Sequence, residues 1–340
     1  MPTTRQHSML HINDYPRLPR FQCRALAAFL ERHQLHFAED IDGAVLAETE
    51  AGDIVGCLAH QDDVLKYFCV ADDHRDEGLG SQLISTLINR LLREYSGVRA
   101  FTSPCRAATF ESLGFQRLAA TSHYALLEFG PRGLDDYLNA VRARLPSTAM
   151  PVNAVVLNAN PFTLGHRYLV QQAAAHGLQT LVFVVANDHS RFRFKDRLAM
   201  VETGCRDLPG VTVCSGGAYM VSGATFPHYF LKQTDHDALA HYQGELDATL
   251  FATRIAPALN ITQRVIGEEP LSPVTAAYNA ALHETLPAYG IQVIELARRE
   301  QAGSVISASR VRALLDAEDN AWEALVPETT RDYILTHGLN

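Results

Sequence analysis

The second half of the chain alternates short apolar runs with stretches of helical periodicity. The apolar runs are rich in β-branched residues, which favour strands. They lie at residues 155–158, 181–185, 211–213, 265–267 and 291–296. Strands that alternate with helices form a parallel sheet with helices on both faces. The sequence therefore predicts an α/β, Rossmann-like domain here, with its ligand site at the carboxyl ends of the strands.

The length of the chain exceeds that of one typical domain. Its 340 residues include 47% hydrophobic residues, which is ample for buried cores. Turn-forming residues cluster at Gly130–Gly133 and at Arg144–Pro151. We therefore expect a smaller α/β domain at residues 1–130, a connector at 131–150 and the Rossmann-like domain at 151–340.

Charge and cysteine content exclude several classes of protein. The net charge of −9 and the lack of a Lys/Arg block argue against nucleic acid as a partner. Six cysteines are scattered singly, with no spacing suited to zinc, so we expect buried, reduced thiols and no metal held by the protein. Neither a signal peptide nor an apolar run long enough to cross a membrane is present. We expect a cytoplasmic protein that does not bind membranes.

The segment Leu157–His166 joins the first predicted strand to a helix. Asn160 and Pro161 are typical turn residues. Gly165 then allows close approach to the backbone at the start of the helix, where unpaired N–H groups and the helix dipole favour an anion. We expect a phosphate there, with His166 pointing at it.

The segment Ile306–Arg312 repeats this logic on another helix. Ser307 or Ser309 can cap the helix, and Arg312, one turn in, can reach the β- and γ-phosphates of a nucleotide. The alternative motifs GxxxxGK and GxGxxG are absent, so neither a P-loop enzyme nor a dinucleotide dehydrogenase fits.

Together the two segments resemble the T/HxGH and ISxSxxR signatures of the nucleotidyltransferase superfamily. Its members attack the α-phosphate of ATP and release pyrophosphate. The resemblance implies that His166, Thr163 and Arg312 are catalytic residues. The implied ATP-binding residues are Asn158, Phe162, Gly165, His166, Gly267, Glu268, Ser307, Ser309 and Arg312.

Two further features have alternative interpretations. The basic and aromatic run Arg191–Arg197 either reaches the triphosphate from a loop, through Lys195 or Arg197, or is an ordinary helix start. Glu268 either orients the substrate or caps the following helix. The residue types do not separate these alternatives.

The first domain has another pattern. A strand at Leu65–Val70 leads into Arg75–Gly80 and then into a helix with apolar residues at helical spacing. A strand at Val98–Thr102, a short helix through Phe110 and the tripeptide Leu113–Phe115 follow. This order resembles the GNAT acetyltransferase fold over about residues 20–130, in which an RxxGxG loop holds the pyrophosphate of coenzyme A. The implied contacts are Arg75, Glu77, Gly78, Leu79, Gly80 and Ser81.

One departure from that family concerns the general acid. Many active members carry a tyrosine five residues before the Phe of the Gly-Phe pair, where this chain has Phe110. A phenyl ring has no proton to donate to a departing thiolate. We expect a domain that keeps a pocket for a coenzyme A-like arm without acetyltransfer chemistry of its own.

The combination of the two domains resembles the citrate lyase ligase family. The likeness rests on Asn158–His166, Gly267–Pro270 and Ile306–Arg312 and covers nearly the full length. That family activates acetate with ATP and Mg²⁺, then acetylates the thiol of a CoA-derived prosthetic group on the acyl carrier subunit of citrate lyase. The resemblance implies this reaction, these cofactors and this partner here.

Three alternatives stay open. One is an acetate ligase serving malonate decarboxylase, which would carry similar motifs. Another is an adenylyltransferase of a pantetheine or nicotinamide phosphate fused to an acetyltransferase, against which Phe110 argues. The third is a non-enzymatic ATP-sensing module, against which His166 and Arg312 argue.

Overall fold

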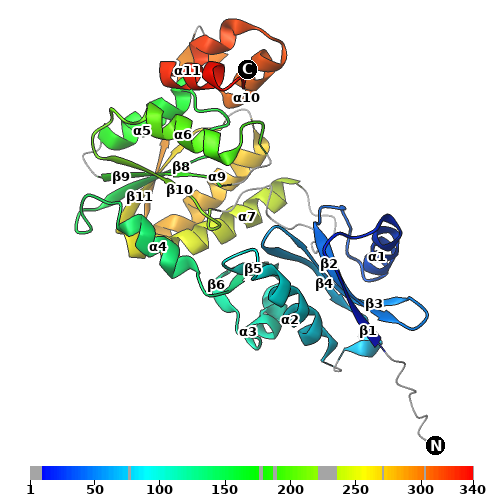
Figure 1. Ribbon diagram of the computed structural model, residues 1–340. Coiled ribbons are helices and arrows are strands. Elements are labelled where there is room, and N and C mark those ends of the chain that lie inside the picture. The colour runs from blue at the N-terminus through cyan, green and yellow to red at the C-terminus, as the bar shows by residue number, and fades with distance from the viewer. Residues whose placement is uncertain are drawn as a thin grey trace, which may run out of the picture. The chain divides into compact units, whose positions relative to one another are not determined.

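The computed structural model separates the chain into two compact units that divide between Gly133 and Leu134 (Figure 1). The described residues are 10–75, 78–175, 179–186, 190–220, 236–269, 272–301 and 304–339. The expected connector at 131–150 contains a helix, α4 (Leu134–Arg142), which belongs to the second unit. Its Tyr137 hydroxyl donates to the carbonyl of Ser215 at 2.8 Å. The functional assignment of the domains stays a prediction.

The described residues of the first unit form a seven-stranded sheet in the order β1-β2-β3-β4-β5-β7-β6. The strands are β1 (Leu10–Tyr15), β2 (Gly43–Thr49), β3 (Ile54–Gln61), β4 (Val64–Val70), β5 (Val98–Thr102), β6 (Gln116–Ala120) and β7 (Ala125–Phe129). The helices are α1 (Arg20–Arg32), the 3₁₀ turn η1 (Asp72–His74), α2 (Leu79–Leu91) and α3 (Pro104–Glu111). The strand and helix order predicted for residues 65–111 is thus confirmed.

The strands β4 and β5 are parallel, whereas the other neighbouring strands of this sheet are antiparallel. Their described pairing is limited to Val64 with Arg99 and Leu65 with Ala100. Beyond these pairs the side chains of Phe68 on β4 and Phe101 on β5 border a pocket. The early end of pairing therefore opens the sheet at this point.

The second unit is built on a parallel sheet in the order β10-β9-β8-β11-β12, as the alternating pattern predicted. Its strands are β8 (Val152–Leu157), β9 (Gln179–Val184), β10 (Val211–Ser215), β11 (Ile261–Gly267) and β12 (Gln292–Leu296). Its further helices are α5 (Leu164–Ala175), α6 (Phe194–Gly204), α7 (His236–Leu250), the π-helical turn η2 (Phe251–Ile255), α8 (Ala256–Leu259), α9 (Pro273–Thr285), η3 (Leu286–Tyr289), α10 (Ala308–Asp316), η4 (Asn320–Leu325) and α11 (Glu328–Thr336). A short hairpin joins β13 (Glu300–Gln301) to β14 (Ser304–Val305).

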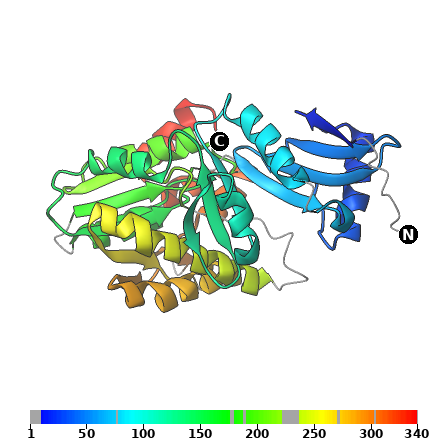
Figure 2. The same ribbon diagram turned by 90° about the horizontal axis from the view of Figure 1, so that it is seen from below.

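The strand order reverses direction between β8 and β11. The chain passes from β8 to β9 and β10 on one side, then crosses back to β11 and β12 on the other. The helices α5 and α6 accordingly cover one face of the sheet, and α7 and α9 lie on the opposite face, side by side (Figures 1 and 2). Such a switch point leaves a crevice at the carboxyl ends of the strands, where α/β proteins bind ligands.

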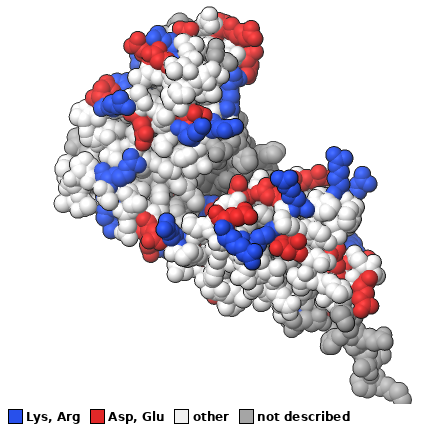
Figure 3. Space-filling model, viewed as in Figure 1, with Lys and Arg blue, Asp and Glu red and all other residues white. Residues whose placement is uncertain are grey.

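The surface charges and the cysteines can be compared with the sequence-based expectations. On the face shown in Figure 3, basic and acidic side chains are interspersed. Within the described ranges, no helix has both the length and the apolar character needed to cross a membrane. The cysteines 57, 69, 205 and 214 are buried as expected, but Cys105 is exposed and Cys23 is partly buried, so the prediction of six buried thiols was wrong. Cys105 is the second residue of α3, and its side chain is exposed.

Candidate active site

A cavity of about 1050 Å³ lies at the switch point of the second unit. Residues at the carboxyl ends of β8, β11 and β12 border it, together with residues from α5, α9 and α10. From the first motif it is lined by Asn158, Thr163, Gly165 and His166, and from the second by Ser307, Ser309 and Arg312. The fold thus brings both motifs to one cavity.

Arg312 ties the second motif directly to the first. Its Nη1 atom donates to the carbonyl oxygen of Asn160 at 2.7 Å, across 152 positions of sequence. Its Nη2 atom donates to the hydroxyl of Ser309 at 3.1 Å. Burial, and then the charge of Arg191, lowers the pKa of Arg312. The guanidinium is therefore a half-buried cation held at the cavity wall.

Gly165 of the first motif lies against the backbone of the second motif. A Cβ atom there would lie 3.1 Å from the carbonyl oxygen of Ile306 and 3.5 Å from the hydroxyl of Thr163. The carbonyl of Ile306 lies where a Cβ atom of residue 165 would point, and a phosphate at the backbone N–H groups of this helix start stays a prediction. A side chain at this position would press on the backbone of the second segment.

His166 is held in one orientation. Its Nδ1 atom accepts the backbone N–H of Thr163 at 3.0 Å and lies 3.0 Å from the Thr163 hydroxyl. The ring of Phe162 stacks parallel to it, with centroids 6.0 Å apart. Burial, with a further contribution from Arg298, lowers the pKa of His166 to about 4. At neutral pH the imidazole is therefore uncharged, and because Nδ1 accepts a hydrogen bond, we assign its proton to Nε2.

Of the remaining ATP-binding candidates, Gly267 and Ser307 line the cavity, whereas the side chains of Phe162 and Glu268 are not part of its described wall. Gly267 lines the cavity, and Ser307 caps α10 by accepting the backbone N–H of Arg310 at 3.2 Å. The ring of Phe162 is fully buried, and the exposed side chain of Glu268 is not part of the described cavity wall. Glu268 contributes through its backbone instead, because its carbonyl accepts Nε of Arg298 at 2.7 Å.

The buried side chain of Arg197 does not face the cavity. Its guanidinium donates to the carbonyls of Asn158 at 2.6 Å, Val185 at 2.8 Å and Phe192 at 3.1 Å. It therefore joins the ends of β8 and β9 to the start of α6. The exposed Lys195 is also absent from the described cavity wall.

Arg191, at the start of the same basic run, lines the cavity instead. It forms an ion pair with Asp316 at the end of α10. The run thus reaches the cavity, but through a residue that the sequence did not single out. The alternating basic residues have equivalent local patterns, so only the path of the loop distinguishes them.

Three more arginines at the site were missed from the sequence. Arg298 and Arg299 follow the end of β12, and Arg264 lies within β11. A position just after a parallel strand is a signal that would have found the first two. Among the described residues of the cavity wall, five arginines face one carboxylate, Glu269, which itself pairs with Arg298. The site is strongly cationic.

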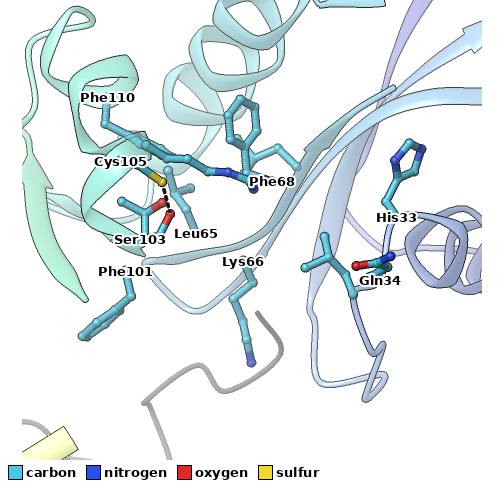
Figure 4. Close-up of a pocket in the computed structure, with 13 residues that line it drawn as sticks. His33, Gln34, Leu65, Lys66, Phe68, Phe101, Ser103, Cys105 and Phe110 are labelled. Atoms are coloured by element: carbon cyan, nitrogen blue, oxygen red, sulfur yellow. Dashed lines mark hydrogen bonds between the residues drawn. The ribbon is translucent and has the colours of Figure 1, made fainter. Parts of the chain in front are cut away.

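The first unit has its own pocket, of about 280 Å³, where β4 and β5 separate (Figure 4). The rings of Phe68 and Phe110 meet edge to face, with centroids 5.6 Å apart. The thiol of Cys105 lies 3.2 Å from the hydroxyl of Ser103, shown as a dashed line in Figure 4. Phe110, which stands where an acid was expected, lines this pocket.

The glycine loop of the first unit leads directly into α2. Gly78 caps the helix with a φ of +73°, a left-handed conformation that favours glycine. A Cβ on Gly80 would lie 3.0 Å from the ring of Phe68, and the Leu79 side chain is buried. Ser81 is exposed, and Arg75 pairs with Asp72 at 2.5 Å. Glu77 lies outside the described residues.

Fold and site define a two-unit α/β protein in which a GNAT-type sheet precedes a Rossmann-like unit with a cationic cavity. The family model for the citrate lyase ligase C-terminal domain matches residues 152–334, and the model for the acetyltransferase (GNAT) domain matches residues 40–117. The chain belongs to the citrate lyase ligase family. The predicted family, its ligase class and the GNAT-like first domain are confirmed.

Three relatives are similar over almost their full length, and each is named citrate (pro-3S)-lyase ligase. The protein of Klebsiella pneumoniae is 40% identical over 319 residues, which are 92% of either chain. The protein of Escherichia coli K12 is 34% identical over 91% of this chain and 89% of its own. That of Haemophilus influenzae is 35% identical over 91% of this chain and 94% of its own.

Proposed function

We propose that the protein activates acetate with ATP and then acetylates the thiol of a CoA-derived prosthetic group on the acyl carrier subunit of citrate lyase. The single observation that carries the first step is the switch-point cavity, where five arginines and one carboxylate stand among the described lining residues. A site of this charge fits a nucleoside triphosphate. The names of the relatives favour the citrate lyase carrier over that of malonate decarboxylase.

Adenylation would use His166 as a neutral hydrogen-bond donor. Its Nε2–H can stabilise a non-bridging oxygen of the α-phosphate as charge develops there, while Thr163 holds Nδ1 and thus the tautomer. Arg312 and Arg191 would bind the β- and γ-phosphates that leave as pyrophosphate. Both arginines line the cavity: Arg312 lies in α10, and Arg191 lies just before the start of α6.

A magnesium ion fits this site as a companion of the triphosphate. Glu269, the carboxylate among the described lining residues, is engaged by Arg298, so phosphate oxygens and water would supply most of the ligands. When bound, the ion would neutralise charge on the departing pyrophosphate. The described residues contain no cluster of three or more His, Cys, Asp or Glu that could hold a metal by themselves.

The thiolysis step needs little acid catalysis. The acetyl-adenylate is already activated, so the prosthetic-group thiolate attacks its carbonyl carbon, the thioester bond forms and AMP leaves. The pocket between β4 and β5 would hold the arm, and its Phe110 offers no proton. The first unit would then position the thiol for this attack.

The proposal is tested by acetate-dependent exchange of pyrophosphate into ATP, followed by transfer of labelled acetate to a deacetylated carrier. We expect exchange without any carrier and transfer to the citrate lyase carrier. The malonate decarboxylase carrier is the matched comparison. Pyrophosphate exchange that does not depend on acetate, or equal transfer of acetate to both carriers, would contradict the proposal.

Removing the guanidinium of Arg312 should weaken ATP binding and slow adenylation together. Charge-assisted hydrogen bonds contribute about 1.5 to 3 kcal/mol. Arg312→Ala should therefore lower the kcat/KM for ATP in the exchange reaction by roughly 10- to 100-fold. Arg312→Lys should recover only part of this, because it lacks the planar fork. Arg310→Ala, an exposed change on the same helix, is the control. An unchanged ATP dependence in Arg312→Ala would remove this residue from the site.

A negative charge at the start of α2 should separate the two half-reactions. Ser81 is exposed and is the third residue of the helix, where an acidic side chain stabilises the helix but repels an incoming pyrophosphate. For Ser81→Asp we expect normal pyrophosphate exchange and a fall of about tenfold or more in carrier acetylation. Ser81→Asn is the neutral control. Gly80 is a poorer position, because a side chain there would press on Phe68.

The result that would contradict this prediction is equal carrier acetylation by Ser81→Asp and Ser81→Asn over a range of carrier concentrations. The prosthetic arm would then enter the second unit by a route that avoids the RxxGxG loop. Exchange measured in the same samples shows whether the variants are folded and active.

A further inference from the structure

An arginine lies at the centre of the parallel sheet. Arg264 pairs in register with Ala154 of β8 and Val293 of β12, so it belongs to an inner strand, and it is only 3% exposed. Inner strands of a parallel sheet covered by helices are normally apolar. A buried guanidinium is costly unless its charge and its donors are satisfied. The position therefore calls for a functional explanation.

The protein leaves part of this guanidinium unsatisfied. Among the described residues, its Nε and Nη1 atoms are buried and have no hydrogen-bond partner. Its Cζ atom lies 4.7 Å from the ring centroid of Phe251, a cation–π contact that compensates only partly. The carboxylate of Asp247 accepts the hydroxyl of Tyr278. Phe251 begins the π-helical turn η2, and such turns are frequent at functional sites.

Arg264 is part of the wall of the switch-point cavity. It lies three residues before the end of β11 at Gly267, or about 10 Å deeper along the strand at 3.3 Å per residue. The arginines that would bind phosphates lie on loops and helix starts at the strand ends. The lining residues from β11, α7 and α9 include the apolar Ala240, Ile266 and Leu282 as well as the polar Gln243, Tyr278 and Asn279. A small anion with an apolar end fits this part of the cavity.

We infer that Arg264 binds the carboxylate of the acid that is activated, a small monocarboxylate such as acetate. This inference rests on the proposed function and names the residue that receives its second substrate. The guanidinium donates to one carboxylate oxygen while the other attacks the α-phosphorus. The new bond joins that oxygen to phosphorus, the bond to the bridging oxygen breaks, and pyrophosphate leaves with the electron pair. The methyl group lies against the apolar wall.

The test compares Arg264→Met with Arg264→Lys in acetate-dependent pyrophosphate exchange. For Arg264→Met we expect the KM for acetate to rise about tenfold or more, because a charge-assisted hydrogen bond is lost. We expect Arg264→Lys to recover part of the loss. The Kd for ATP, measured by calorimetry without acetate, should change less than about twofold. Gln263→Met, the adjacent residue of the same strand, which points to the other face of the sheet, is the matched control.

A second readout is independent of catalysis. Burying a charged group whose donors lack partners is costly, so Arg264→Met should fold and melt at or above the wild-type Tm. Potassium acetate, compared with potassium chloride at equal ionic strength, should raise the Tm of the wild type and of Gln263→Met but not that of Arg264→Met. A merely structural arginine would show the reverse, with a lower Tm and an unchanged response to acetate.

Three results would overturn the inference. A raised Kd for ATP with an unchanged KM for acetate would assign Arg264 to the nucleotide. Unchanged values of both would make it structural, as would an acetate-induced Tm rise that survives in Arg264→Met. A wild type that binds ATP but shows no acetate-dependent exchange would contradict the proposed function instead. The acetate melting experiment still decides the role of Arg264 in that case.

Discussion

Replacing His166 with asparagine is expected to slow acetate-dependent pyrophosphate exchange by about 10²- to 10³-fold, the usual cost of removing one donor aimed at transition-state charge. The side chain is half-buried beside the cavity, and its Nδ1 accepts from Thr163, so Nε2 is the donor. The fold should remain intact, since His166 lies outside the apolar core cluster of this unit. Circular dichroism and the Tm check this point.

A glutamine at the same position makes the prediction sharper. The amide nitrogen of glutamine lies near the position of Nε2, whereas that of asparagine lies near Nδ1. His166→Gln should therefore retain more exchange activity than His166→Asn. Because the pKa of His166 is about 4, the wild-type rate should show no ionisation of this imidazole between pH 5 and 8. Near wild-type exchange in His166→Asn would remove this residue from the mechanism.

The largest effect on stability is expected from Arg197, whose guanidinium is fully buried. Arg197→Met leaves the carbonyls of Asn158, Val185 and Phe192 without this donor, and each buried acceptor left unsatisfied costs about 1 to 3 kcal/mol. Thermal and urea unfolding of the full chain measure the loss. The carboxyl ends of β8 and β9 should become less ordered, because Asn158 and Val185 directly follow these strands.

The control for this prediction is Lys195→Met on the same helix. Lys195 is exposed, and an exposed change of this kind usually alters stability by less than about 0.5 kcal/mol. If Arg197→Met were as stable as Lys195→Met, the hydrogen bonds of Arg197 would be of no net value.

Local sequence patterns were sufficient to predict the strands and helices that carry each motif. The β-branched runs predicted the strands β8 to β12, because periodicity reports which side of a short segment is buried. The turn from Leu157 to His166 and the serine cap at Ser307 were predictable because neighbours within four residues form them. The family resemblance added the expected partner and reaction, which the periodicity of apolar residues does not indicate.

Tertiary structure alone decided how these parts meet. The hydrogen bond from Arg312 to Asn160, the contact of Gly165 with Ile306 and the burial of Arg197 depend on strand order, which places residues far apart in sequence against each other. The same holds for Arg264, which in the sequence is the last of three consecutive polar residues in the strand β11. Burial and unpaired donors become visible only when the helices cover the sheet. Sequence therefore determined which groups are available, and packing determined which of them line the cavity and which hold the fold together.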